Sequence, residues 1–103
     1  MPRLLFTLLL LSAGTVAADT LEVSIVNMKY VPEVLTVKPG DTVRWVNNEK
    51  RSNHSVYFKA EGLPDSERLF PGDSHQRTFD KAGSYPYECG PHPEMKGLIE
   101  VKP

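Results

Sequence analysis

Residues 85–95 read YPYECGPHPEM, a strand-like aromatic run that leads straight into a short loop with three metal-binding side chains. Cys89, His92 and Met95 follow one another with two residues between successive members. A proline on either side of His92 restricts the backbone there, because the proline ring fixes φ. The spacing predicts a stiff loop that brings a thiolate, an imidazole and a thioether to one metal ion.

A fourth ligand has to come from another part of the chain, and His54 is the natural choice. It lies in residues 53–58, a strand-like segment well before the Cys89 loop. Two imidazoles, one thiolate and a weak axial Met are the ligand set of blue-copper electron-transfer sites. Sulfur ligands suit Cu(I), while imidazole suits both oxidation states. His54, Cys89, His92 and Met95 are therefore predicted to bind one type I copper ion.

Other uses of these side chains fit the sequence less well. A structural zinc site usually takes several Cys ligands and no Met, whereas this chain has a single Cys. A catalytic pair of Cys and His is conceivable, but a nucleophile and its base do not need a Met three residues after the His. The remaining alternative is that Cys89 and Met95 only fill the core and that the histidines lie on loops.

The spacing of apolar and aromatic residues predicts β-strands throughout the chain. Such runs occur near residues 21–25, 43–45, 56–58, 76–79, 85–89 and 98–101. Turn signals separate them, and Pro39-Gly40 and Pro71-Gly72 suit type II turns because glycine accepts positive φ. About seven to eight short strands with closely spaced turns predict an all-β protein, a Greek-key β-sandwich. Residues 61–68 form the one long irregular stretch, with room for a helical turn.

Taken together, these motifs resemble those of the cupredoxins, the small type I copper proteins. The chain is most similar to the amicyanin group, whereas plastocyanin and pseudoazurin have a longer gap between the last His and the Met. The similar segments span residues 27–30, 39–47, 54, 78–89 and 97–101. The resemblance implies a cupredoxin-like sandwich, one bound copper ion, electron transfer and the same four ligand positions.

Two positions next to the ligands depart from the pattern of this family. In most relatives an Asn follows the first His and a Thr or Ser follows the Cys, and the two side chains join the ligand segments. This chain has Ser55 and Gly90 instead. Because Gly90 has no side chain, the tether cannot form in the usual way, and contacts of this kind tune metal sites strongly.

Residues 1–18 have the composition of a secretory signal peptide, with Arg3 near the start, an apolar run, and small residues before Asp19. The apolar run is too short to span a bilayer, which takes about 20 residues. A lipid anchor would need a Cys at the cleavage site, and the single Cys is Cys89. Cleavage before Asp19 is expected to leave residues 19–103 as one cupredoxin domain, exported to the periplasm as a soluble protein without membrane insertion.

The charge balance argues against nucleic acid as a partner. The chain has 12 Lys and Arg against 13 Asp and Glu, a net charge of −1, and loss of Arg3 makes it slightly more negative. A protein that binds phosphates by counterion release needs a basic excess instead. A single Cys also excludes an internal disulfide, so a bound metal is expected to contribute to the stability of this small domain.

These features predict a periplasmic one-electron carrier that is not an enzyme. It would shuttle electrons between a donor, a dehydrogenase or membrane complex, and an acceptor, a cytochrome c or an oxidase. A nitrite reductase or multicopper oxidase needs further copper ions held by paired histidines, and the chain has three His and no His-x-His. The alternative is a periplasmic copper carrier or chaperone without redox turnover, although a thiolate in a stiff loop favours slow exchange.

The exposed edge of His92 is predicted to be the place where redox partner proteins dock on a monomer. The expected patch around it consists of Pro91 and Pro93, with Met28 and Phe70 as further members. It follows that the electron would leave through this face.

Three further aromatic positions have structural interpretations. Trp45 shares its phase with Val43 and is expected in the core, since aromatic residues dominate small cores. Tyr85 resembles the corner tyrosine of Greek-key sandwiches. His75 has no ligand spacing and is expected on the surface.

Overall fold

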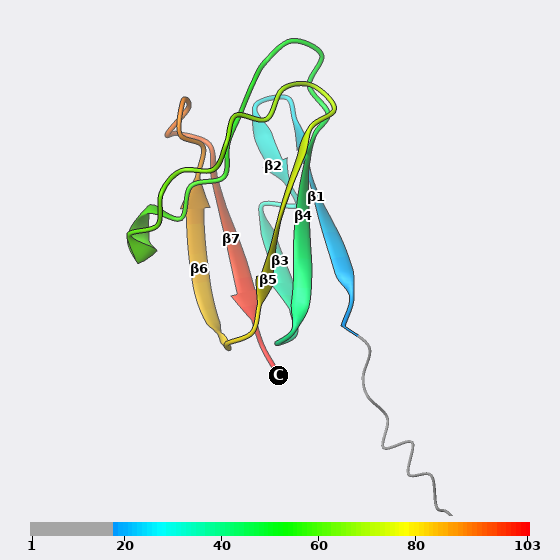
Figure 1. Ribbon diagram of the computed structural model, residues 1–103, viewed down its shortest axis with the longest axis vertical. Coiled ribbons are helices and arrows are strands. Elements are labelled where there is room, and N and C mark those ends of the chain that lie inside the picture. The colour runs from blue at the N-terminus through cyan, green and yellow to red at the C-terminus, as the bar shows by residue number, and fades with distance from the viewer. Residues whose placement is uncertain (1–17) are drawn as a thin grey trace, which may run out of the picture.

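The computed structural model describes residues 18–103 as two β-sheets packed face to face (Figure 1). Its elements are β1 (Thr20–Val26), β2 (Lys29–Val31), β3 (Val34–Val37), β4 (Asp41–Asn47), the 3-10 helix η1 (Lys59–Glu61), β5 (Ser74–Phe79), β6 (Gly83–Glu88) and β7 (Lys96–Val101). One sheet has the strand order β2-β1-β4-β5 and the other β3-β7-β6. The predicted all-β sandwich is confirmed.

Strands that are distant in the sequence lie side by side in both sheets. β1 runs parallel to β4, and β3 runs parallel to β7, while the other pairs are antiparallel. The chain changes sheet after β2, β3 and β5, as in Greek-key sandwiches. Because β1, β4 and β6 all point the same way, the loops that follow them meet at one end of the molecule, uppermost in Figure 1.

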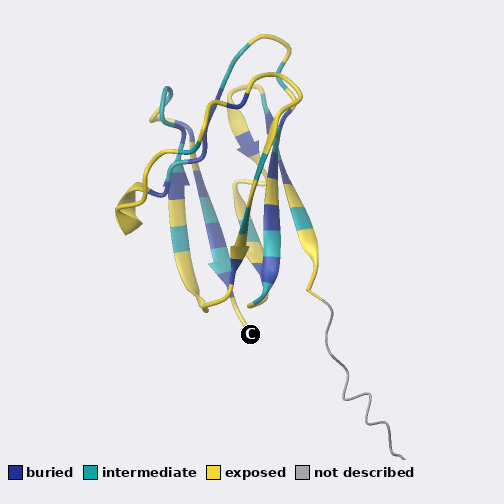
Figure 2. Ribbon diagram, in the orientation of Figure 1, coloured by how far each residue is buried: buried dark blue, intermediate teal, exposed yellow. Residues whose placement is uncertain are grey.

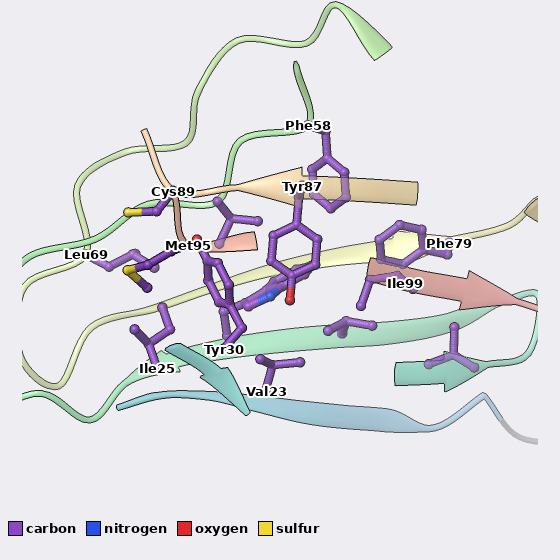
Figure 3. Packing of buried hydrophobic residues seen from close by; sticks show 14 of the residues in the cluster. Val23, Ile25, Tyr30, Phe58, Leu69, Phe79, Tyr87, Cys89, Met95 and Ile99 are labelled. Atoms are coloured by element: carbon purple, nitrogen blue, oxygen red, sulfur yellow. The ribbon is translucent and has the colours of Figure 1, made fainter. Parts of the chain in front are cut away.

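The core fills the space between the two sheets with alternate residues of each strand (Figures 2 and 3). Trp45 is fully buried, as predicted, and meets Tyr87 edge to face with ring centroids 5.4 Å apart. Such aromatic pairs contribute about 0.5–1.5 kcal/mol beyond the area they bury. Cys89 and Met95 belong to the same cluster, so the metal-binding loop packs directly on the core.

The two predicted type II turns are present. Gly40 has φ of 95° and the amide of Asp41 donates to the carbonyl oxygen of Lys38 at 3.0 Å. Gly72 has φ of 89° and the amide of Asp73 donates to the carbonyl oxygen of Phe70 at 2.8 Å. Glycine accepts this left-handed conformation without a steric penalty, which explains why the chain turns at these two places.

The segment around residues 56–58 does not form the expected strand. His54 pairs with Leu69, and Tyr57 pairs with Glu88 at the end of β6, each as an isolated bridge. The segment is extended and buried, yet it divides its backbone hydrogen bonds between two partners, so that no ladder forms. The alternation of apolar and polar residues at 56–58 therefore predicts correctly which side chains are buried, but it does not predict how the segment pairs.

Two short strands were not expected from the sequence. β2 has three residues and β3 has four, and both are largely exposed. Neither is long enough to show a clear alternation, so pairing with β1 and β7 defines them instead.

Arg77 in β5 holds η1 and the preceding Phe58 against the sheet. Its guanidinium carbon lies 4.4 Å from the ring centroid of Phe58 and 4.5 Å from that of Phe79. Its two terminal nitrogens each donate to Glu61 at 2.8 Å. Nearby, the hydroxyl of Tyr85 donates to the carbonyl oxygen of Lys81 at 2.7 Å, which is the bond expected of a corner tyrosine.

The predicted signal peptide, residues 1–18, falls outside the described residues except for Ala18. From residue 18 onward, no helix combines the length and the apolar character needed to cross a bilayer. The boundary between a leader and a mature domain therefore stays a prediction.

Candidate metal centre

Three donor atoms meet at the end of the sandwich where the loops gather. Nδ1 of His54 and Nδ1 of His92 are 3.2 Å apart, and they lie 3.7 Å and 3.6 Å from Sγ of Cys89. Metal–nitrogen bonds of about 2.0 Å and metal–sulfur bonds of about 2.3 Å place donors of one ion roughly 3–4 Å from each other. The three side chains therefore fit a single shared metal ion.

Each of these side chains is positioned by a backbone contact. His54 is held by two hydrogen bonds with Leu69, from amide to carbonyl in both directions, at 3.0 Å and 2.8 Å. The loop from Cys89 to Met95 is closed by the amide of Cys89, which donates to the carbonyl oxygen of Met95 at 3.0 Å. Within it, the amide of Met95 donates to the carbonyl oxygen of His92 at 2.9 Å. These hydrogen bonds close the loop, which agrees with the stiff loop predicted from the two prolines.

Burial separates the donors into two kinds. His54 and Cys89 are completely buried and Met95 is 4% exposed, whereas His92 is only partly buried. The sulfur atoms of Cys89 and Met95 face the same side of the core in Figure 3. His92 is thus the one member of this group that connects the buried donors with the surface.

Burial, and next the neighbouring His92, lower the pKa of His54 below its ordinary value, while Glu49 acts in the opposite direction. A lowered pKa keeps the imidazole neutral at physiological pH, which leaves the lone pair of Nδ1 free for a metal. Nε2 of His54 lies 3.4 Å from a carboxylate oxygen of Glu49. Within residues 18–103 this buried nitrogen makes no hydrogen bond, so the carboxylate is a charged neighbour rather than a hydrogen-bond acceptor.

Glu49 was not found from the sequence, because it looks like one charge among several in a loop. In the structure its side chain is 15% exposed, and its Oε1 accepts the amide hydrogen of Met28 at 2.7 Å. Met28 and Asn27 both have positive φ, at 58° and 53°, in the turn between β1 and β2. A non-glycine pair in this conformation is strained and needs support from its surroundings, which Glu49 provides.

The ligand segments are joined at the two positions that depart from the family pattern. The amide of Gly90 donates to Oγ of Ser55 at 2.8 Å. The amide of Ser55 points at Sγ of Cys89 at 3.4 Å, the geometry of a hydrogen bond to a thiolate. The two side chains that join the ligand segments in most relatives are absent, as expected. A hydrogen bond between the Ser55 side chain and the Gly90 backbone joins the segments instead.

His75 does not take part in this group. Its Nδ1 lies 3.0 Å from Oε1 of Glu67, and its ring centroid lies 6.0 Å from that of Trp45, its partner across β4 and β5. It is 25% exposed at the side chain, so it is a surface residue with one acidic neighbour. This leaves two histidines for metal binding.

The donor set itself indicates the metal. One thiolate, two neutral imidazoles and a nearby thioether are soft or intermediate ligands of the kind that copper takes in electron-transfer sites. Hard cations such as Mg²⁺ and Ca²⁺ take oxygen donors, which this group does not offer. His54, Cys89, His92 and Met95 have the arrangement of a type I copper site.

Comparisons with known proteins agree with this chemistry. Amicyanins from Paracoccus versutus and Paracoccus denitrificans are 40% and 39% identical over 95 residues, which span 88% of this chain and 71% and 72% of theirs. A plastocyanin from Scenedesmus fuscus is 38% identical over 85 residues, spanning 71% of this chain and 86% of its own. The similarity to the amicyanin group is confirmed.

Solved structures give the same result. The Cu(I) form of a methionine-to-alanine mutant of amicyanin matches with a TM-score of 0.76 and 37% identity, covering 87% of this chain and 89% of its own. A copper-containing nitrite reductase from Thermus scotoductus matches with a TM-score of 0.75 and 29% identity, over 82% of this chain but only 22% of its own. Residues 17–102 match the model of the copper binding proteins of the plastocyanin/azurin family. The chain belongs to this family.

Proposed function

We propose that the protein is a periplasmic one-electron carrier in which His54, Cys89, His92 and Met95 hold one copper ion. The observation that carries the proposal is the convergence of three donor atoms within 4.8 Å of one another, two of them on fully buried side chains. Copper in such a setting supplies a Cu(I)/Cu(II) couple. The protein holds the donor side chains in position and provides the surface on which a partner docks.

Backbone hydrogen bonds and core packing hold the donor side chains in place. The paired hydrogen bonds between His54 and Leu69 and the closed loop from Cys89 to Met95 fix the backbone on both sides of the site. Packing of Cys89 and Met95 in the core limits side-chain movement as well. Donors that cannot move far keep the same geometry in both oxidation states, which favours fast electron exchange.

His92 offers the route to a partner. It is the partly exposed member of the group, and two exposed apolar side chains, Met28 at 38% and Phe70 at 54%, belong to loops at the same end of the sandwich. With Pro91 and Pro93 they would form an apolar patch on which a redox protein docks. Lys50 and Arg51, both exposed, lie in the loop before His54 and would favour an acidic partner face.

Two other functions receive less support. The match covers only 22% of the nitrite reductase, and within residues 18–103 the remaining histidine, His75, has Glu67 beside it and no second histidine with which to form another copper site. A copper chaperone would need donors that a partner can reach, whereas His54, Cys89 and Met95 are buried. The proposed localisation in the periplasm is supported by the predicted signal peptide and by the redox role.

A chelator experiment distinguishes a carrier of electrons from a carrier of copper. The mature protein, loaded with one equivalent of Cu(II), would be reduced and reoxidised repeatedly in the presence of the Cu(I) chelator bathocuproine disulfonate. An electron carrier is expected to regain its full colour in each cycle with its copper retained. Transfer of the copper to the chelator on first reduction would contradict the proposal and support the copper carrier.

A further inference from the structure

The peptide between Cys89 and Gly90 is surrounded by contacts that a side chain on Gly90 would not allow. On one side Oγ of Ser55 accepts the Gly90 amide hydrogen at 2.8 Å. Ser55 is fully buried and directly follows His54 in the sequence. This peptide is therefore the point where the two segments of the metal centre are joined.

A third segment reaches the same point through Asp65. A Cβ atom built on Gly90 would lie 2.0 Å from Oδ2 of Asp65 and 2.8 Å from Oγ of Ser55. Both distances are shorter than real contacts of a Cβ atom, so a side chain at position 90 would have to displace this carboxylate. The glycine thus admits a negatively charged group against the backbone that follows the thiolate.

The charge of Asp65 is only weakly compensated. Its one ion pair within residues 18–103 is with Arg68, at 4.0 Å, and the two side chains are 30% and 47% exposed. A long, half-exposed pair of this kind neutralises little. Behind the same peptide, burial above all raises the pKa of Tyr30, and Asp65 acts in the same direction; the Tyr30 hydroxyl donates to the carbonyl oxygen of Ser55 at 2.5 Å.

We propose that Asp65 lowers the reduction potential of the copper centre, acting as a fixed negative charge that Gly90 admits beside the Cys89 peptide. The inference rests on the electron-carrier function proposed above. Oxidation adds one positive charge to the centre, and a nearby carboxylate stabilises the more positive state. Asp65 lies against the backbone that directly follows Cys89, so its charge acts over a short distance, at which salt screens least.

A series of substitutions separates charge from structure, because the residue that touches Gly90 can be changed in steps. Asp65→Asn removes the charge at nearly constant shape, and Asp65→Lys reverses it. The reduction potential is expected to rise in the order Asp, Asn, Lys, and the shift from wild type to Lys is expected to be about twice the shift from wild type to Asn, because the charge changes by two units instead of one. A role in folding alone would not produce this graded order.

Glu67 provides the matched control. It lies two residues further along the same stretch, its side chain is 62% exposed, and its carboxylate contacts His75 rather than the metal-binding loop. Glu67→Gln and Glu67→Lys make the same changes of charge, and they are expected to shift the potential much less. Shifts at position 65 no larger than those at position 67 would overturn the inference.

A second measurement does not depend on copper. In the metal-free protein, the NMR resonance of the Gly90 amide is expected to move in Asp65→Asn and to stay in place in Glu67→Gln, because Asp65 lies beside Gly90 and Glu67 does not. An unmoved Gly90 resonance in Asp65→Asn would contradict the contact. A wild-type protein without a reversible couple would overturn the electron-carrier function and this inference together, whereas a reversible couple indifferent to Asp65 overturns the inference alone.

Discussion

Nε2 of His54 lies 3.4 Å from Oε1 of Glu49, and the same oxygen accepts the amide hydrogen of Met28 at 2.7 Å. One carboxylate thus contacts both a buried imidazole and the strained turn between β1 and β2. A carboxylate this close to Nε2 favours the tautomer with the proton on that nitrogen, which leaves the lone pair of Nδ1 for the metal. Glu49 is a positioning residue for His54.

Glu49→Gln keeps the shape of this side chain and removes its charge. The reduction potential is expected to rise, because the Cu(II) state loses a nearby negative charge. The metal-free protein is expected to lose about 1–3 kcal/mol of unfolding free energy, the usual cost of weakening a hydrogen bond to a charged group. Voltammetry and urea unfolding measure the two effects. Glu94→Gln, an exposed change in the metal-binding loop, serves as control; equal shifts in both variants would contradict the role of Glu49.

Asp41 makes folding depend on pH. Its carboxylate accepts the amides of Lys38 and Asp19, both at 2.9 Å, and these bonds, that of Lys38 first, lower its pKa below the ordinary value of 3.8. A carboxyl with a lowered pKa stabilises the fold above its unfolded pKa, and this contribution is lost as the pH falls through the folded pKa.

Asp41→Asn is therefore expected to lower the urea midpoint at about pH 7, with a difference from wild type that shrinks towards about pH 2.5. Asp80→Asn, an exposed change in the loop after β5, is the control and is expected to have little effect. A difference for Asp41→Asn that is constant with pH would show that the carboxylate bonds do not stabilise the fold.

Arg77→Lys retains the charge but loses the paired bonds to Glu61 and the planar stacking on Phe58 and Phe79. Lysine cannot replace arginine in such a place. The variant is expected to unfold with about 1–2 kcal/mol less free energy. Urea unfolding of the metal-free protein measures this difference in free energy. Arg44→Lys, at an exposed position of β4, is the control. Equal stability of the two variants would exclude a structural role for Arg77.

Lys50 and Arg51 are expected to influence the rate of association with a redox partner. Reversing both to Glu is expected to slow second-order electron transfer to the physiological partner at low ionic strength, since charges at the rim of an interface act mainly on encounter. Added salt should remove most of the difference by screening. Stopped-flow kinetics over a range of salt concentrations measures this. An unchanged rate at low salt would show that docking uses another surface.

The fold was largely predictable because alternation and turn chemistry are local properties. A few neighbouring residues are enough to predict that Trp45 faces the core. The same holds for the two turns, where Gly40 and Gly72 each follow a proline. The exceptions depend on pairing at a distance. Residues 56–58 share their hydrogen bonds between two partners, and β2 is only three residues long.

The site shows the same division. The spacing of Cys89, His92 and Met95 is visible in the sequence because one short loop contains all three residues. Glu49 and Asp65 come from other loops and resemble ordinary surface charges until the fold brings them to His54 and Gly90. Only three-dimensional proximity distinguishes them from other acidic residues of the chain.

The central claim is that Cys89 and its neighbours form a type I copper centre. The most direct test is the visible absorption spectrum of the Cu(II)-loaded protein beside that of Cys89→Ser, before and after reduction. The account predicts an intense blue band in the wild type, caused by charge transfer from the thiolate, that disappears on reduction, returns on oxidation and is absent from the variant. A wild type without this band, or a variant that retains it, would contradict the account.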